Sequence, residues 1–185
     1  MPKEADYESL AALEKVEKDV GYPVTAPAAF SNGYAFDGLH VVGQAIYGES
    51  DEVLQEYYGV SVTYVKPDAQ KLYLDVTPIL QLEGGHAAPA PNEERTVGGV
   101  TVGLSRDHFK LVPPDYEKTE DDLAREAAGH YYISFGANEI EERDMAFAGF
   151  AMDGVNYTLM DMFASENSFD TLTQMAKEII EAAKR

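Results

Sequence analysis

Apolar side chains near the C-terminus recur at intervals of three and four residues, the spacing that gathers them on one face of a helix. Ser168 stands just before this run and suits an N-cap, because its hydroxyl can accept a hydrogen bond from a free amide of the first turn. The pattern predicts a helix from about Ser168 to Arg185 with one face buried on a core. That face consists of Leu172, Met175, Ala176, Ile179, Ile180 and Ala183.

A second helical pattern lies near the N-terminus, where apolar and charged residues occupy opposite sides from about Asp6 to Val20. Gly21 predicts the end of this helix, because glycine readily adopts the left-handed conformation found after a helix C-terminus. Two prolines and an Asn-Gly pair interrupt residues 21–33, so we expect an extended connector there.

From about Leu39 the hydrophobic period changes to two, which is the period of a strand with one buried face. Two successive runs alternate apolar with polar residues, and the turn-like segment 66–70 separates them. They predict a β-hairpin. Its apolar positions are Val60, Val62, Tyr64, Leu72, Leu74 and Val76.

The same alternation predicts four further strands in the second half of the chain. Asp153-Gly154 marks a tight turn before the last strand, because both central residues of a type I′ turn need positive φ. Pro113-Pro114 ends regular pairing after the first, and residues 117–128 suit a short helix and an exposed loop equally. Residues 83–94 are rich in Gly, Ala and Pro and predict a surface loop. The four strands cover residues 97–104, 130–135, 145–152 and 155–159.

The order of these elements is a helix, a series of strands and a second helix. No helical crossover long enough for a parallel βαβ unit separates most successive strands, so we expect antiparallel pairing. The sequence therefore predicts a single α+β domain over residues 1–185. Its expected architecture is a curved antiparallel sheet of six or seven strands, with the N-terminal and C-terminal helices packed on one face.

Composition narrows the classes of function. The chain of 185 residues has 14 Lys and Arg against 33 Asp and Glu, a formal net charge of −19 that repels nucleic acids and anionic lipid surfaces. It has no Cys, which excludes a disulfide framework and a cysteine nucleophile. No run approaches the roughly 18 apolar residues of a membrane span, and the N-terminus lacks the pattern of a secretory signal.

Few residues suggest chemistry. The four histidines, His40, His86, His108 and His130, lack the spacing that places two metal ligands on one helix face. Carboxylates are densest in residues 138–144, where a solvated hairpin loop is a better interpretation than a weak calcium site. Nucleotide-binding and nucleophile motifs are absent. We therefore expect no enzymatic activity, no cofactor and no metal.

The strongest binding candidates are two pairs of adjacent tyrosines, Tyr57 with Tyr58 and Tyr131 with Tyr132. Successive residues of a strand point to opposite faces, so one ring of each pair should lie on the face away from the helices. Such rings can anchor a protein partner or a sugar. They can also shield the sheet through cross-strand contacts, which is the commoner use.

Both ends of the chain resemble one family. The strand 154–160 followed by 172–179, and the opening helix with Val20-Gly21-Tyr22 before Pro23, Pro27 and 32–34, resemble a DUF4367-type domain. The resemblance implies the extracytoplasmic part of an anti-sigma-factor-like membrane protein of Gram-positive bacteria. It transfers no catalytic residue, because the matched positions are caps, turns and core.

The leading functional hypothesis is therefore a non-enzymatic extracytoplasmic domain that senses a signal or binds a protein. The alternative is a carrier of a small apolar ligand, held in a pocket between sheet and helix. A hydrolase using His and Asp is a third hypothesis. An upstream membrane anchor would favour the sensor, whereas a native start at Met1 would make the chain a cytoplasmic protein.

Overall fold

The computed structural model describes residues 4–47, 52–68, 71–80, 90–164 and 167–184. Within these ranges the chain forms nine strands, three α-helices and one short 3-10 helix. The elements are β1 (Ala5–Tyr7), η1 (Leu10–Ala12), α1 (Leu13–Val20), β2 (Ala35–Tyr47), β3 (Val53–Val65), β4 (Leu72–Pro78), β5 (Glu93–Val97), β6 (Val100–Val112), α2 (Glu120–Ala128), β7 (Tyr131–Phe135), β8 (Glu141–Met152), β9 (Val155–Asp161) and α3 (Phe169–Ala182).

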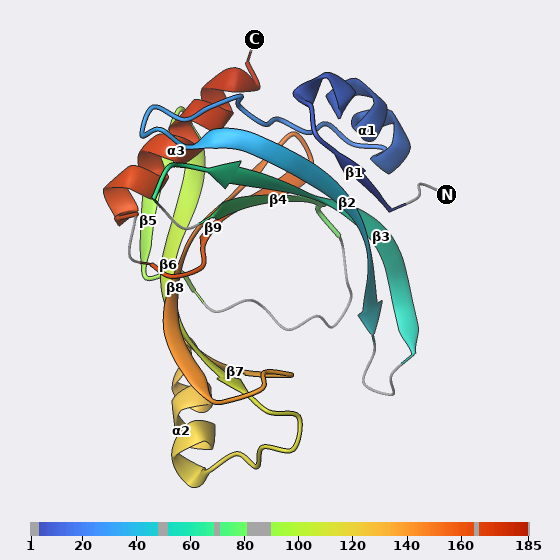
Figure 1. The fold of residues 1–185 in the computed structure, drawn as a ribbon. Coiled ribbons are helices and arrows are strands. Elements are labelled where there is room, and N and C mark those ends of the chain that lie inside the picture. Colours follow the sequence, from blue (N-terminus) through green and yellow to red (C-terminus); the bar gives the residue numbers. More distant parts are fainter. Residues whose placement is uncertain (1–3, 48–51, 69–70, 81–89, 165–166, 185) are drawn as a thin grey trace.

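All nine strands belong to one open sheet in the order β1-β2-β3-β4-β9-β8-β6-β5. The sheet forms an arch, and α1 and α3 lie over its outer face (Figure 1). β5 pairs with the first half of β6, and β7 pairs with the second half. The last strand, β9, lies in the interior of the sheet between β4 and β8. The α+β class is confirmed, but the sheet has more strands than the six or seven expected.

The hydrophobic core fills the space between the outer face of the arch and the helices. α3 supplies Leu172, Met175, Ala176, Ile179 and Ile180, all of them buried, so this part of the predicted stripe is confirmed. Ser168 caps the helix as expected, because its hydroxyl accepts a hydrogen bond from the Thr171 amide. The sheet contributes residues that include the six apolar positions of the predicted hairpin.

The helices contribute unequally, which corrects the expected packing. α3 contacts β5, β6 and β8, whereas Val16 is the one buried residue of α1. α2, which the sequence left undecided between helix and loop, packs on β7. None of the helices in the described part of the chain is long and apolar enough to cross a membrane.

The N-terminal prediction was wrong at its beginning. Residues Ala5–Tyr7 form β1 and pair with Leu39–Val41 of β2, so the sheet captures a segment whose local pattern favoured a helix. The α-helix starts only at Leu13. Its predicted end is confirmed, because Gly21 has φ +86° and its amide donates to the Glu17 carbonyl.

Two errors concern the neighbourhood of β6. The predicted strand 97–104 contains the turn Gly98-Gly99, where both residues have positive φ and join β5 to β6. Part of the predicted loop 83–94 lies outside the described residues, and Glu93 and Glu94 begin β5. The predicted turn at Asp153-Gly154 is confirmed, with φ of +52° and +81°.

The expectation of purely antiparallel pairing was also wrong. β7 runs parallel to β6, with His108 opposite Tyr131 and Val112 opposite Phe135. The intervening α2 makes the crossover, although it has only nine residues. A helix this short is enough because the whole connection, residues 113–130, has 18 residues, and a parallel crossover needs about a dozen or more.

Candidate functional site

The inner, concave face of the arch carries the side chains that alternate with the core. On β4, Leu72, Leu74 and Val76 are buried, and so Tyr73 and Asp75 between them point to the opposite face. The same rule places on that face the alternate residues of β3, β6, β8 and β9. Two hollows open there, and they adjoin at a pair of opposed residues, Phe147 on β8 and Met160 on β9.

The larger hollow, which we name the Lys71–Arg143 groove, has a volume of about 510 Å³. Its walls are mostly apolar and come from strands β4, β8 and β9 and from the segment after β9. Two cationic side chains reach it. The lining residues are Lys71, Tyr73, Arg143, Met160, Met162 and Phe163.

Among the described residues, neither cation in this groove has an acceptor within hydrogen-bond distance. The Nε atom of Arg143 is buried without a hydrogen-bond partner there, and a carboxylate oxygen of Glu141 is 4.0 Å away. The guanidinium carbon lies 5.1 Å from the centre of the Phe163 ring, within reach of a cation–π contact. Lys71 Nζ lies 3.8 Å from Asp37, beyond hydrogen-bond distance.

The smaller hollow, which we name the His130 hollow, has a volume of about 290 Å³. Its lining residues are Pro91, Gly103, Ser105, Asp107, His130, Tyr132, Phe147, Gly149 and Thr158. His130 has φ +58°, an uncommon conformation for a residue with a side chain, and its Nδ1 atom lies 2.6 Å from Asp107 Oδ1. The Ser105 hydroxyl makes no hydrogen bond to either side chain in the described structure, so no catalytic triad is assembled.

Asp75 is a half-buried carboxyl group on the same concave face. Ser61 Oγ donates a hydrogen bond to it over 2.6 Å. Burial raises the pKa of the Asp75 carboxyl, and the Ser61 hydrogen bond only partly opposes this rise. Burial, and next the charge of Asp75, raise the pKa of Tyr57, whose hydroxyl donates to the Gln44 side chain. The concave face therefore holds a carboxylate with one neutral donor.

The four candidate tyrosines divide between the two faces, as alternation predicts. Tyr57 and Tyr132 point to the concave face, and Tyr132 stacks on Phe109 with ring centres 5.1 Å apart. Tyr58 packs against the core, and Tyr131 is buried beside α2. The structure thus brings Tyr132 to the His130 hollow and keeps Tyr58 and Tyr131 away from both hollows.

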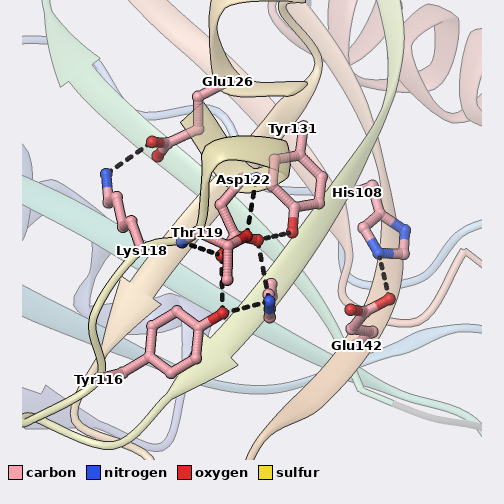
Figure 2. Close-up of polar contacts among 9 residues, drawn as sticks. His108, Tyr116, Lys118, Thr119, Asp122, Glu126, Tyr131 and Glu142 are labelled. Carbon is pink, nitrogen blue, oxygen red and sulfur yellow. Dashed lines mark hydrogen bonds and ion pairs between the residues drawn. The ribbon is translucent and has the colours of Figure 1, made fainter. Parts of the chain in front are cut away.

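A second polar assembly lies on the other face, between α2, β6 and β7. We call it the Asp122 cluster, and it comprises Lys110, Tyr116, Thr119, Asp122 and Tyr131 (Figure 2). The buried Asp122 carboxylate accepts hydrogen bonds of 2.6 to 3.0 Å from all four partners. Hydrogen bonds from Lys110 and Tyr116 hold the pKa of Asp122 well below its usual range. Every lone pair is occupied, so the cluster leaves no position for a ligand.

Residues 141–144 of the predicted loop 138–144 belong to strand β8, which divides their side chains between the two faces of the sheet. β8 begins at Glu141, so Glu142 and Asp144 point to one face and Glu141 and Arg143 point to the other. His108 lies between Glu142 and Asp144, with its Nδ1 atom 2.7 Å from Asp144. Its Nε2 atom lies 3.2 Å from Glu142 (Figure 2). Within the described residues no group of metal-ligating side chains is arranged to hold an ion.

Sequence reasoning missed the residues of the Lys71–Arg143 groove. No motif marks them, because they come from three strands and a turn that are distant in sequence. Arg143 stands among acidic residues and reads as part of a charged loop. Its strand position, opposite Phe109 of β6, is what turns it toward the concave face.

Comparisons of the chain with models of protein families, with curated proteins and with solved structures found no match. The resemblance to DUF4367-type domains therefore remains a prediction.

Proposed function

We propose that this chain is a non-enzymatic binding domain that recognises its ligand or protein partner on the concave face of the sheet. One observation carries the proposal: the two hollows adjoin on this face, and in one of them the buried Nε atom of Arg143 has no hydrogen-bond partner among the described residues. The face under the helices differs, because buried side chains fill it. A hollow of about 520 Å³ opens at the edge of this face, between the start of α3 and strands β5 and β6, where the ion pair of Arg95 with Asp170 borders it. The carrier hypothesis would use this hollow.

The hydrolase hypothesis has one observation in its favour. The Asp107 carboxylate can accept a hydrogen bond from His130 Nδ1, and His130 lines a hollow, an arrangement that a general base also uses. A catalytic assembly also needs a nucleophile within hydrogen-bond reach, and Ser105 makes no such bond. The pair is therefore better suited to holding a polar group of a ligand.

The sensory, extracytoplasmic role that we propose for this binding rests on the resemblance of the two chain ends. It requires that ligand binding on the concave face changes the conformation or dynamics of the surface that contacts a partner. Hydrogen exchange with and without a bound ligand measures this directly. Protection confined to the contacting residues would argue for simple binding, whereas a change that reaches α1 or α3 would support signalling.

The test of the binding proposal is a screen of small molecules and short peptides by NMR on the isotope-labelled chain. Ligands should shift the resonances of Thr158, Tyr132 and Gly149. Gly149→Leu is a blocking variant, because a Cβ atom built there meets no other atom within 4 Å and the side chain would enter the His130 hollow. Ala124→Leu, exposed on α2, is its control. Shifts mapping only to the helical face, or turnover of an ester, would overturn the proposal.

A further inference from the structure

We infer that the Lys71–Arg143 groove binds an amphipathic anion, a small molecule with one carboxylate or phosphate head on an apolar chain. This inference rests on the proposed function and names the ligand class for one of its two hollows. It follows from three properties of the groove: the state of its cations, the chemistry of its walls and the charge of the surrounding protein.

The cations of the groove are available to a ligand. Elsewhere Lys110, Lys118 and Arg95 are bonded to carboxylates at 2.5 to 2.8 Å. Lys71 and Arg143 lie at 3.8 and 4.0 Å from theirs, and neither makes a hydrogen bond to any described residue. A guanidinium without an acceptor matches a carboxylate or phosphate, which can accept two parallel N–H bonds.

Burial makes the missing acceptor more costly. The Arg143 side chain is only 22% exposed, and its Nε atom has neither water access nor a partner in the described part of the chain. An unpaired buried donor is unfavourable, and more so when it carries charge. An anionic head in the groove would offset this penalty through its attraction to the guanidinium charge, so binding gains from a group that the folded protein already holds in place.

The walls determine the rest of the ligand. Tyr73 and Met160 are opposed on neighbouring strands, and Met162 and Phe163 extend the apolar surface beyond the end of β9. Methionine side chains adapt to different apolar shapes. The volume of about 510 Å³ lies within the range of small-molecule sites. An inorganic anion would leave these walls uncovered, which favours a ligand with an apolar chain.

The net charge of the protein limits the charge that the ligand's head group can carry. A field of −19 opposes the approach of polyanions, so nucleic acids and strongly acidic peptides are poor ligands. A single head group is repelled far less, and two local cations can compensate for it. The same field would attract cations generally, which makes binding of an anion here a specific prediction.

The test is calorimetric titration of the full chain with decanoate and with decyl phosphate, below their micelle concentrations. Decyltrimethylammonium has the same chain with the opposite charge, and acetate has the head without the chain. We expect one or both decyl anions to bind, and the tighter of the two identifies the head group. Binding of decyltrimethylammonium equal to that of the anions, or no binding of either anion, would overturn the inference.

Variants locate the site. Arg143→Met and Lys71→Met should each weaken anion binding by about tenfold or more, because each removes a charge-assisted hydrogen bond. Lys177→Met, exposed on α3, removes the same charge elsewhere and should leave affinity unchanged. Lys71 is 57% exposed, so its replacement should not disturb folding even if that of Arg143 does.

Equal affinity in Lys71→Met and Lys177→Met would refute the assignment to this groove. The inference can fail while the proposed function stands. If other ligands still shift the resonances of Tyr132 and Gly149 but decanoate does not bind, this inference alone is overturned. Binding of decanoate that Gly149→Leu leaves intact and Lys71→Met abolishes would support both.

Discussion

The Asp122 cluster and the Lys71–Arg143 groove both place charged groups among aromatic rings, yet they differ in how well those groups are bonded. Asp122 accepts from four surrounding residues, and its ion pair with Lys110 measures 2.8 Å. Arg143 has a buried Nε atom that finds no acceptor among the residues that the structure describes. Full bonding marks a group that the fold requires, and missing bonds mark a group that another molecule can complete. We therefore assign a structural role to the first and a binding role to the second.

The largest expected effect is on Asp122. Asp122→Ala leaves Lys110, Tyr116 and Tyr131 without their common acceptor, and it also removes the capping box at the start of α2. We expect a large fall in Tm and amide exchange from residues 119–135 that is about tenfold faster or more. Asp121→Ala, an exposed carboxylate of the same first turn, should change both only slightly. Comparable effects in the two variants would show that the Asp122 cluster contributes no more to stability than an exposed carboxylate does.

Low pH should also remove the contribution of the Asp122 carboxylate to folding stability. The folded-state pKa of Asp122 lies below its value in the unfolded chain, about 3.9, so the unfolded state takes up the proton first as the pH falls. The stabilisation is complete above the unfolded pKa and is lost as the pH drops toward the folded one. The difference in Tm between wild type and Asp122→Asn should therefore shrink from pH 5 to pH 2. A constant difference would contradict this.

Removing the hydroxyl of Tyr131 should have an intermediate effect on stability, and the adjacent Tyr132 provides a matched control. The Tyr131 hydroxyl donates to Asp122 over 3.0 Å, whereas the Tyr132 hydroxyl makes no hydrogen bond to the described residues. Tyr131→Phe should lower the free energy of unfolding by about 1 to 2 kcal/mol, and Tyr132→Phe by less than about 0.5. Chemical denaturation measures both. The reverse order would reassign the structural role to the concave face.

Replacing Asp75 should have the smallest effect on stability, and the effect should be an increase. Its folded-state pKa is raised above the unfolded value of about 3.9, so the folded chain holds this proton to a higher pH. Its contribution is complete below the unfolded pKa and declines as the pH rises through the folded one. At pH 7, Asp75→Asn should raise Tm by about 2 to 4 °C at most, equivalent to 1 kcal/mol. Glu56→Gln, exposed on β3, controls for net charge.

Local signals predicted the parts of the fold that local geometry determines. Ser168 and the stripe of α3, Gly21 and the Asp153-Gly154 turn were readable because a cap, a period or a positive φ decides them. β1 was not, since its pairing with residues 39–41 of β2 is a tertiary contact. α2 could have been predicted from Thr119 and Asp122, which have the spacing of a capping box.

The candidate site was less predictable than the fold. Alternation correctly divided Tyr57 from Tyr58 between the faces, but the lateral neighbours of each ring depend on strand order. β9 lies beside β4, which is what brings Met160 opposite Tyr73. No local pattern encodes that pairing, so Lys71 and Arg143 could not be recognised as parts of one groove.

The interior position of β9 has a consequence for synthesis of the protein. Pro78 of β4 pairs with Val155 of β9, so one edge of β4 has no partner until most of the chain has been made. At about 5 to 20 residues per second, that interval lasts roughly 4 to 16 seconds on the ribosome. An unpaired strand edge is a template for association with another chain. The nascent protein is therefore most prone to aggregation between the emergence of β4 and that of β9, when a chaperone would protect it most.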